Sequence, residues 1–180
     1  GRTTELFAFQ LFDLQDDVDI VSIGKMSQVC ATLYRKHLKP KPGLISQTFT
    51  SSTTAIEAAN IILTKLASND YFGNDGKIAQ LHTYFINKLQ DLEKKYPADI
   101  SDFRGVGSMI AFKLFEGNYE ESLFFIKTCY KNGLILFIAG NKPTYIRFLL
   151  PVGATNCNHI DEAIAIIEQS LMTIKEGASI

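Results

Sequence analysis

The sequence predicts an α/β fold whose last part, from about residue 98, is a compact α+β sandwich. Apolar residues recur at helical spacing in several stretches, and short apolar runs bounded by glycine and proline lie between them. Hydrophobic residues make up 46% of the 180 residues and charged residues 21%, which excludes a disordered chain. The expected order is one strand, two helices, two strands, one helix, two strands and one helix.

The first predicted elements lie before residue 70. The run at 19–25 (DIVSIGK) predicts a buried strand in a parallel sheet, because it contains a short apolar stretch that is rich in β-branched residues and ends in glycine. Residues 33–43 are basic and contain two prolines, so we expect an exposed connection there. Residues 55–66 keep the spacing of an apolar helix face, and Ser52 or Thr53 is placed to cap that helix.

The later elements follow a glycine-rich break at 73–76. An apolar stripe from Ile78 to Leu92 predicts a long helix, which ends before Pro97 because proline cannot continue the hydrogen-bond ladder. The remaining pattern predicts strands at 101–104 and 108–115, a helix at 119–131, strands at 134–139 and 145–150, and a helix from Asn158 or Asp161 to about Thr173.

Charge and cysteine content narrow the class of protein. Lys plus Arg number 18 and Asp plus Glu number 19, so the net charge is −1 and we expect no nucleic-acid partner bound through bulk positive charge. The three cysteines are an odd number without a CxxC pair, which favours a reducing compartment and no disulfide framework. Cys157 and His159 lack a second pair of ligands, so no metal site is predicted. No apolar run is long enough to span a membrane and no signal sequence opens the chain, so we expect a cytoplasmic protein with no membrane partner.

Two segments at predicted element ends carry residues suited to chemistry. Lys25 stands at the end of the predicted strand, which is where open α/β sheets bind ligands, and an amine there is placed to form a Schiff base with a carbonyl cofactor. The alternative is a strand-end lysine that reaches solvent. Hydroxyl side chains gather between Thr48 and Thr54, directly before a helix, where they indicate either a phosphate site or ordinary capping.

The third candidate is a guanidinium within an apolar strand. Arg147 lies in the run at 145–151 (YIRFLLP), where a charged side chain must be paired or must serve a ligand. A guanidinium binds a carboxylate through two parallel hydrogen bonds, so a ligand carboxylate and a structural ion pair are both open at this point. Six phenylalanines are expected to pack in cores or in an oligomer interface: Phe7, Phe9, Phe12, Phe124, Phe125 and Phe137.

Together these segments resemble the class III aminotransferases, which depend on pyridoxal 5'-phosphate (PLP). The matching segments come in the family's order: GRTTELFAF at 1–9, DIVSIGK at 19–25, QTF at 47–49, FRGVGSMIAF at 103–112 and IRFLLP at 146–151. Within the family, GKMSQVC at 24–30 is most similar to the L-lysine 6-aminotransferase group, with the 4-aminobutyrate and ornithine aminotransferases as close rivals.

The resemblance implies a domain plan. The chain would be the C-terminal portion of a fold type I PLP-dependent transferase, holding the end of the large-domain sheet and the α+β small domain. Residues 1–72 would be a remnant of the PLP-binding large domain, residues 73–97 a long connecting helix and residues 98–180 the small domain.

The resemblance also implies a role for each candidate residue. Lys25 would carry PLP and move a proton between substrate and cofactor. Thr48 would bind the phosphate of the PLP held by the opposite subunit of a homodimer. Arg147 would hold a substrate carboxylate. The implied reaction transfers the terminal amine of an amino acid donor, lysine or a similar ω-amino acid, to 2-oxoglutarate.

Departures from the family pattern limit the activity that we expect of the isolated chain. Residues 50–52 (TSS) stand where the family has Gly-Gly-Asn. The family's glycine-rich phosphate loop, its ring-stacking aromatic residue and the acid that pairs with the pyridine nitrogen have no counterpart in this sequence. We therefore expect little or no transaminase activity from the isolated chain. Two alternatives are another PLP reaction, such as racemisation or decarboxylation, and a truncated, non-catalytic relative that acts as a binding or structural module.

Overall fold

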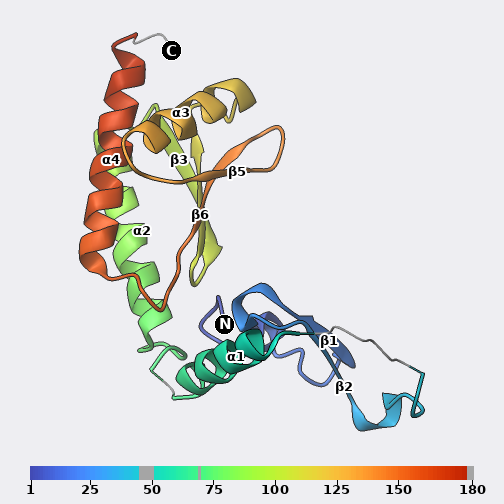
Figure 1. The fold of residues 1–180 in the computed structure, drawn as a ribbon. Coiled ribbons are helices and arrows are strands. Elements are labelled where there is room, and N and C mark those ends of the chain that lie inside the picture. The colour runs from blue at the N-terminus through green and yellow to red at the C-terminus, as the bar shows by residue number, and fades with distance from the viewer. Residues whose placement is uncertain (45–50, 69, 178–180) are drawn as a thin grey trace. The chain divides into compact units, whose positions relative to one another are not determined.

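The computed structural model describes residues 1–44, 51–68 and 70–177. The chain divides into two compact units, one made of residue 1 and residues 3–76, the other of residue 2 and the chain from Lys77 onward. Figure 1 shows the elements of both units along the chain. The two units are described separately below.

The first unit contains a two-stranded antiparallel hairpin. β1 (Ile20–Ile23) pairs with β2 (Ala31–Tyr34), with Ile20 opposite Tyr34. The prediction of a buried strand in a parallel sheet is wrong, because the pairing is antiparallel and Ile20 is 57% exposed. A short apolar run does not encode the direction of its partner, which here comes from residues 31–34. Part of the segment predicted as a connection is therefore strand, although its side chains are exposed as expected.

One helix and three short 3-10 turns complete the first unit. The elements are η1 (Ala8–Phe12), η2 (Lys25–Ser27), η3 (Lys36–Leu38) and α1 (Thr53–Leu66). The predicted cap of α1 is confirmed: the Ser52 hydroxyl accepts a hydrogen bond from the Ala55 N–H at 3.2 Å. Ala59 and Leu66 of the apolar stripe are buried, whereas Ile56 is 49% exposed. This unit therefore covers only part of its apolar surface.

The second unit is a two-layer α+β sandwich, as the sequence predicts. Its antiparallel sheet has the strand order β3-β4-β6-β5. The strands are β3 (Ile100–Val106), β4 (Met109–Leu114), β5 (Phe137–Ala139) and β6 (Tyr145–Leu149), and the helices are α2 (Lys77–Lys95), α3 (Tyr119–Lys131) and α4 (Cys157–Lys175). Each predicted element from residue 77 onward is present in the predicted order.

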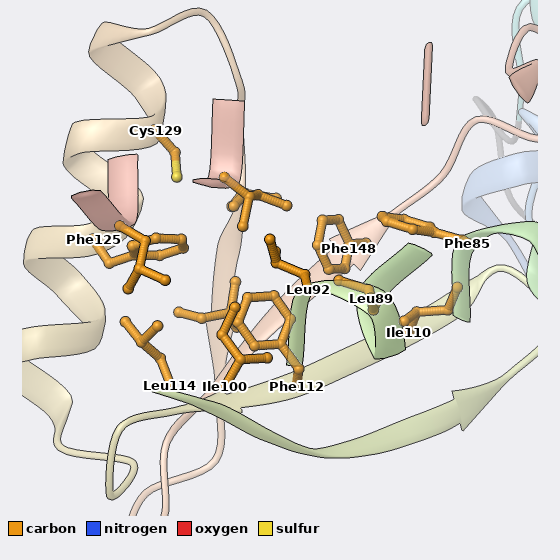
Figure 2. Packing of buried hydrophobic residues seen from close by; sticks show 14 of the residues in the cluster. Phe85, Leu89, Leu92, Ile100, Ile110, Phe112, Leu114, Phe125, Cys129 and Phe148 are labelled. Carbon is orange, nitrogen blue, oxygen red and sulfur yellow. The ribbon is translucent and has the colours of Figure 1, made fainter. Parts of the chain in front are cut away.

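One core joins the three helices to one face of this sheet (Figure 2). The predicted stripe of α2 is confirmed, because all five of its residues are at most 5% exposed: Ile78, Leu81, Phe85, Leu89 and Leu92. Alternate residues of β4 and β6, such as Phe112 and Phe148, meet that stripe, and the Phe85 and Phe148 ring centroids lie 4.6 Å apart. The intervening residues, Arg147 among them, belong to the opposite face of the sheet.

The three thiols differ in their environment, which gives a chemical test of the core. Cys129 is fully buried against α4, and burial raises the pKa of its thiol to about 11, while Cys30 and Cys157 are exposed. Near neutral pH we expect a disulfide reagent to titrate the two exposed thiols quickly and Cys129 only after unfolding. Because the unfolded chain releases the Cys129 proton near pH 9, the free energy of unfolding should fall as pH rises from about 9 through 11. If all three thiols of the folded chain reacted at the same rate, this description would be contradicted.

Candidate functional site

Lys25 lies where β1 ends and η2 begins, so the predicted strand-end position is confirmed. Its φ of 59° is in the left-handed region, which non-glycine residues adopt only when the surrounding structure requires it. Its carbonyl oxygen accepts hydrogen bonds from the Gln28 backbone N–H at 2.9 Å and the Gln28 side-chain amide at 3.3 Å. The lysine side chain is exposed, and within the described residues neither a hydrogen bond nor an ion pair holds its ammonium.

The neighbours of Lys25 fix the turn that carries it. The Ser27 side chain is buried and its hydroxyl donates a hydrogen bond to the Val29 carbonyl at 2.7 Å. A Cβ atom at Gly24 would lie 3.2 Å from the Cys30 sulfur, so a larger residue there would crowd the hairpin. α1 also contacts η2. The backbone around the amine is therefore held, while the amine itself is open to a reactant.

Among the described residues, the side chain of Lys25 is the one that suits PLP. An exposed primary amine on a held turn suits the carbonyl group of PLP, so Lys25 is a chemically suitable anchor. Thr48, expected to bind the PLP phosphate, lies outside the described residues. Ser52 belongs to the same hydroxyl-rich stretch, and its hydroxyl caps α1, so the capping interpretation holds for this residue.

Arg147 lies on the sheet face opposite the helices. It is directly opposite Ala111 of β4 and Phe137 of β5, so these three side chains share a face. The centre of the guanidinium is 5.8 Å from the centroid of the Phe137 ring. The side chain is half-buried, and its Nε atom is buried and has no hydrogen-bond partner within residues 1–44, 51–68 and 70–177. Phe137 is 42% exposed and outside the core, which corrects the core interpretation of this residue.

A second arginine on the same face provides a contrast. Arg104 is opposite Ala111 on its other side, and two of its nitrogens donate to the two carboxylate oxygens of Asp102, each at 3.0 Å. That guanidinium, and the Tyr145 hydroxyl that donates at 2.6 Å, lower the pKa of the Asp102 carboxyl. Among the described residues no acid pairs with Arg147. The structural ion pair that the sequence left open for Arg147 is therefore absent among the described residues, whereas Arg104 forms one with Asp102.

The structure places the predicted residues in different units. Lys25 belongs to the first unit and Arg147 to the second. The contact of Phe137 with Arg147 is the feature that sequence reasoning missed. A signal for it exists, because a five-residue loop at 140–144 between the two predicted strands sets Phe137 opposite Arg147.

Comparison with known proteins identifies the family. The model of the class III aminotransferases matches residues 1–171. The chain belongs to the class III aminotransferase family. The resemblance found in the sequence segments is therefore confirmed, and the mixed α/β fold is that of the family's known structures.

Individual members of the family match along almost the whole chain. Succinylornithine transaminase of Photorhabdus laumondii is 27% identical over 96% of this chain and 42% of its own length. The 5-aminovalerate aminotransferase of Pseudomonas putida is 29% identical over 97% of this chain and 42% of its own length. A solved structure of lysine aminotransferase from M. tuberculosis is 25% identical, with a TM-score of 0.79, over 97% of this chain and 39% of that one. The chain thus spans about two fifths of the length of these relatives. Within its described residues no helix is long and apolar enough to cross a membrane.

Proposed function

We propose that the complete protein is a PLP-dependent aminotransferase that transfers the terminal amine of an ω-amino donor, such as lysine, to 2-oxoglutarate. The observation that carries the proposal is Lys25, an exposed amine that has no partner among the described residues and stands on a held turn, within the segment that resembles the family's cofactor-binding segment. The names of the three relatives above, transaminases of succinylornithine, 5-aminovalerate and lysine, support a donor of this class.

In this proposal each of the three residues has a defined role. When bound, PLP supplies an electron sink that makes the amine-bearing carbon of the donor acidic. Lys25 supplies the amine that holds the cofactor, and its Nζ atom later accepts and returns the proton of the donor carbon. Arg147 binds a substrate carboxylate through two parallel hydrogen bonds and so orients the donor. Thr48 binds the phosphate of the cofactor held by the partner subunit, so the complete protein is a homodimer.

The proposed domain plan also explains why we expect the isolated chain to be inactive. We propose that residues 1–72 are the end of the cofactor-binding domain, that residues 73–97 connect, and that residues 98–180 form the small domain. The incomplete burial of α1 supports this plan, since further chain is needed to cover that surface. The groups expected to hold the ring and phosphate of PLP would then come from the rest of the complete protein.

Glutamate formation from 2-oxoglutarate tests the function. The complete protein with PLP is expected to form glutamate with L-lysine, ornithine or 5-aminovalerate as donor, and the isolated 180-residue chain is expected to form none. Racemised donor or released CO₂ without glutamate would indicate a different PLP reaction. Absence of any turnover by the complete, PLP-loaded protein would indicate a non-catalytic relative.

A further inference from the structure

We propose that Phe137 is a positioning residue for Arg147: its ring holds one side of the guanidinium and leaves the hydrogen-bond donors to a substrate carboxylate. The inference deepens the proposed function and rests on it to the extent that Arg147 takes a carboxylate. It concerns a side chain that does not touch the reacting atoms, so its effect must act through Arg147.

Strand pairing brings the two side chains together. β5 and β6 pair so that Phe137 is opposite Arg147, and the guanidinium centre lies 5.8 Å from the ring centroid. That separation is within the range of a cation–π contact, and the planar guanidinium is the cation that packs best on an aromatic face. Phe137 lies on an edge strand and is 42% exposed, so burial in the core does not account for it.

An aromatic ring holds a cation without neutralising it. On the same face, Arg104 lies over the Tyr145 ring, 4.7 Å from its centroid, and two of its nitrogens also donate to the Asp102 carboxylate. Arg147 has the ring contact with Phe137 without an acid, and among the described residues its buried Nε atom has no hydrogen-bond partner. Because Nε has no accessible surface, a carboxylate would accept from the two terminal nitrogens of Arg147, which have no partner among the described residues. The ring therefore orients the guanidinium and preserves its capacity for an anion.

The other flank of Arg147 is compatible with such an anion. Ala111 is opposite Arg147 on β4, and its side chain is a single methyl group. No bulky side chain therefore competes from that register position for the space beside the guanidinium. One row of paired residues crosses the sheet: Arg104, Ala111, Arg147 and Phe137. It thus contains one arginine paired with an acid and one arranged for a ligand.

The first test observes the Arg147 side chain directly in the 180-residue chain. Its Nε–Hε signal in a ¹H–¹⁵N NMR spectrum is assigned by its loss in Arg147→Lys. Phe137→Leu is expected to move this signal towards the position of a free arginine and to lower its heteronuclear NOE, because the ring-current shift and the restraint are lost. Phe137→Tyr should keep both, and Ile135→Ala, an exposed neighbour on the same segment, should change neither.

The second test measures the donor KM in the complete protein. Phe137→Leu is expected to raise KM about two- to fivefold, the factor that corresponds to a cation–π contact at an exposed site, with kcat nearly unchanged and with recovery in Phe137→Tyr. Arg147→Lys should raise KM further. If Arg147→Lys raises KM but Phe137→Leu leaves the NMR signal or KM unchanged, the inference about Phe137 is overturned. The proposed role of Arg147 would then still stand. An unchanged KM in Arg147→Lys would instead overturn the proposed role of Arg147, while the NMR signal would still report whether Phe137 positions it.

Discussion

Replacing Lys25 with alanine in the complete protein is expected to lower kcat for glutamate formation by about 10³-fold or more. In the proposed function one amine both holds the cofactor and moves the proton of the donor carbon, so its removal affects two tasks. Lys25→Arg should be equally impaired, because a guanidinium stays protonated and cannot attack a carbonyl carbon. Lys36→Ala, at another exposed lysine of the first unit, is the matched control and should retain activity.

Chemical trapping separates the role of Lys25 from a general loss of folding. The complete protein is mixed with PLP, reduced with borohydride and digested, and the labelled peptides are identified by mass spectrometry. We expect one dominant label, on the peptide that contains Lys25, and its loss in Lys25→Arg. Retained amino transfer in Lys25→Ala, or a label scattered over surface lysines in the active protein, would exclude the role assigned to Lys25.

Phe112→Ala is expected to lower the free energy of unfolding of the second unit by about 3–5 kcal/mol. Phe112 is fully buried, and its ring lies 5.9 Å from that of Phe148, 6.4 Å from that of Phe125 and 6.5 Å from that of Phe103. Truncation to alanine therefore removes contacts with two strands and a helix and leaves a cavity between them. Urea unfolding monitored by backbone circular dichroism measures the change.

Two control substitutions show whether this loss comes from burial. Phe112→Leu keeps part of the volume and should cost less than Phe112→Ala. Phe12→Ala removes a ring that is 68% exposed and should change the free energy of unfolding very little. Equal losses for Phe112→Ala and Phe12→Ala would mean that the described core does not hold the second unit together.

The sequence by itself determines most of the second unit, because local periodicity encodes its elements. The stripe of α2 is visible at helical spacing, and all of it is buried. α3 begins and ends at the predicted residues, since Asn118 accepts hydrogen bonds from the Glu120 and Glu121 N–H groups and caps the helix. Alternation along β6 places Ile146 and Phe148 on one face of the sheet and Arg147 on the other.

Only the tertiary structure shows which strands pair and which side chains contact one another. The run at 20–23 is a strand as predicted, but its antiparallel pairing depends on residues 31–34, two of which the local pattern assigned to an exposed connection. Arg104 and Arg147 both lie in predicted strands. A register irregularity between Ser101 and Arg104 accompanies the pairing of Asp102 with Arg104, whereas strand pairing places Phe137 beside Arg147. Residue type and spacing thus identify which side chains can react or bind, but the strand register of the folded chain decides which of them already have a partner.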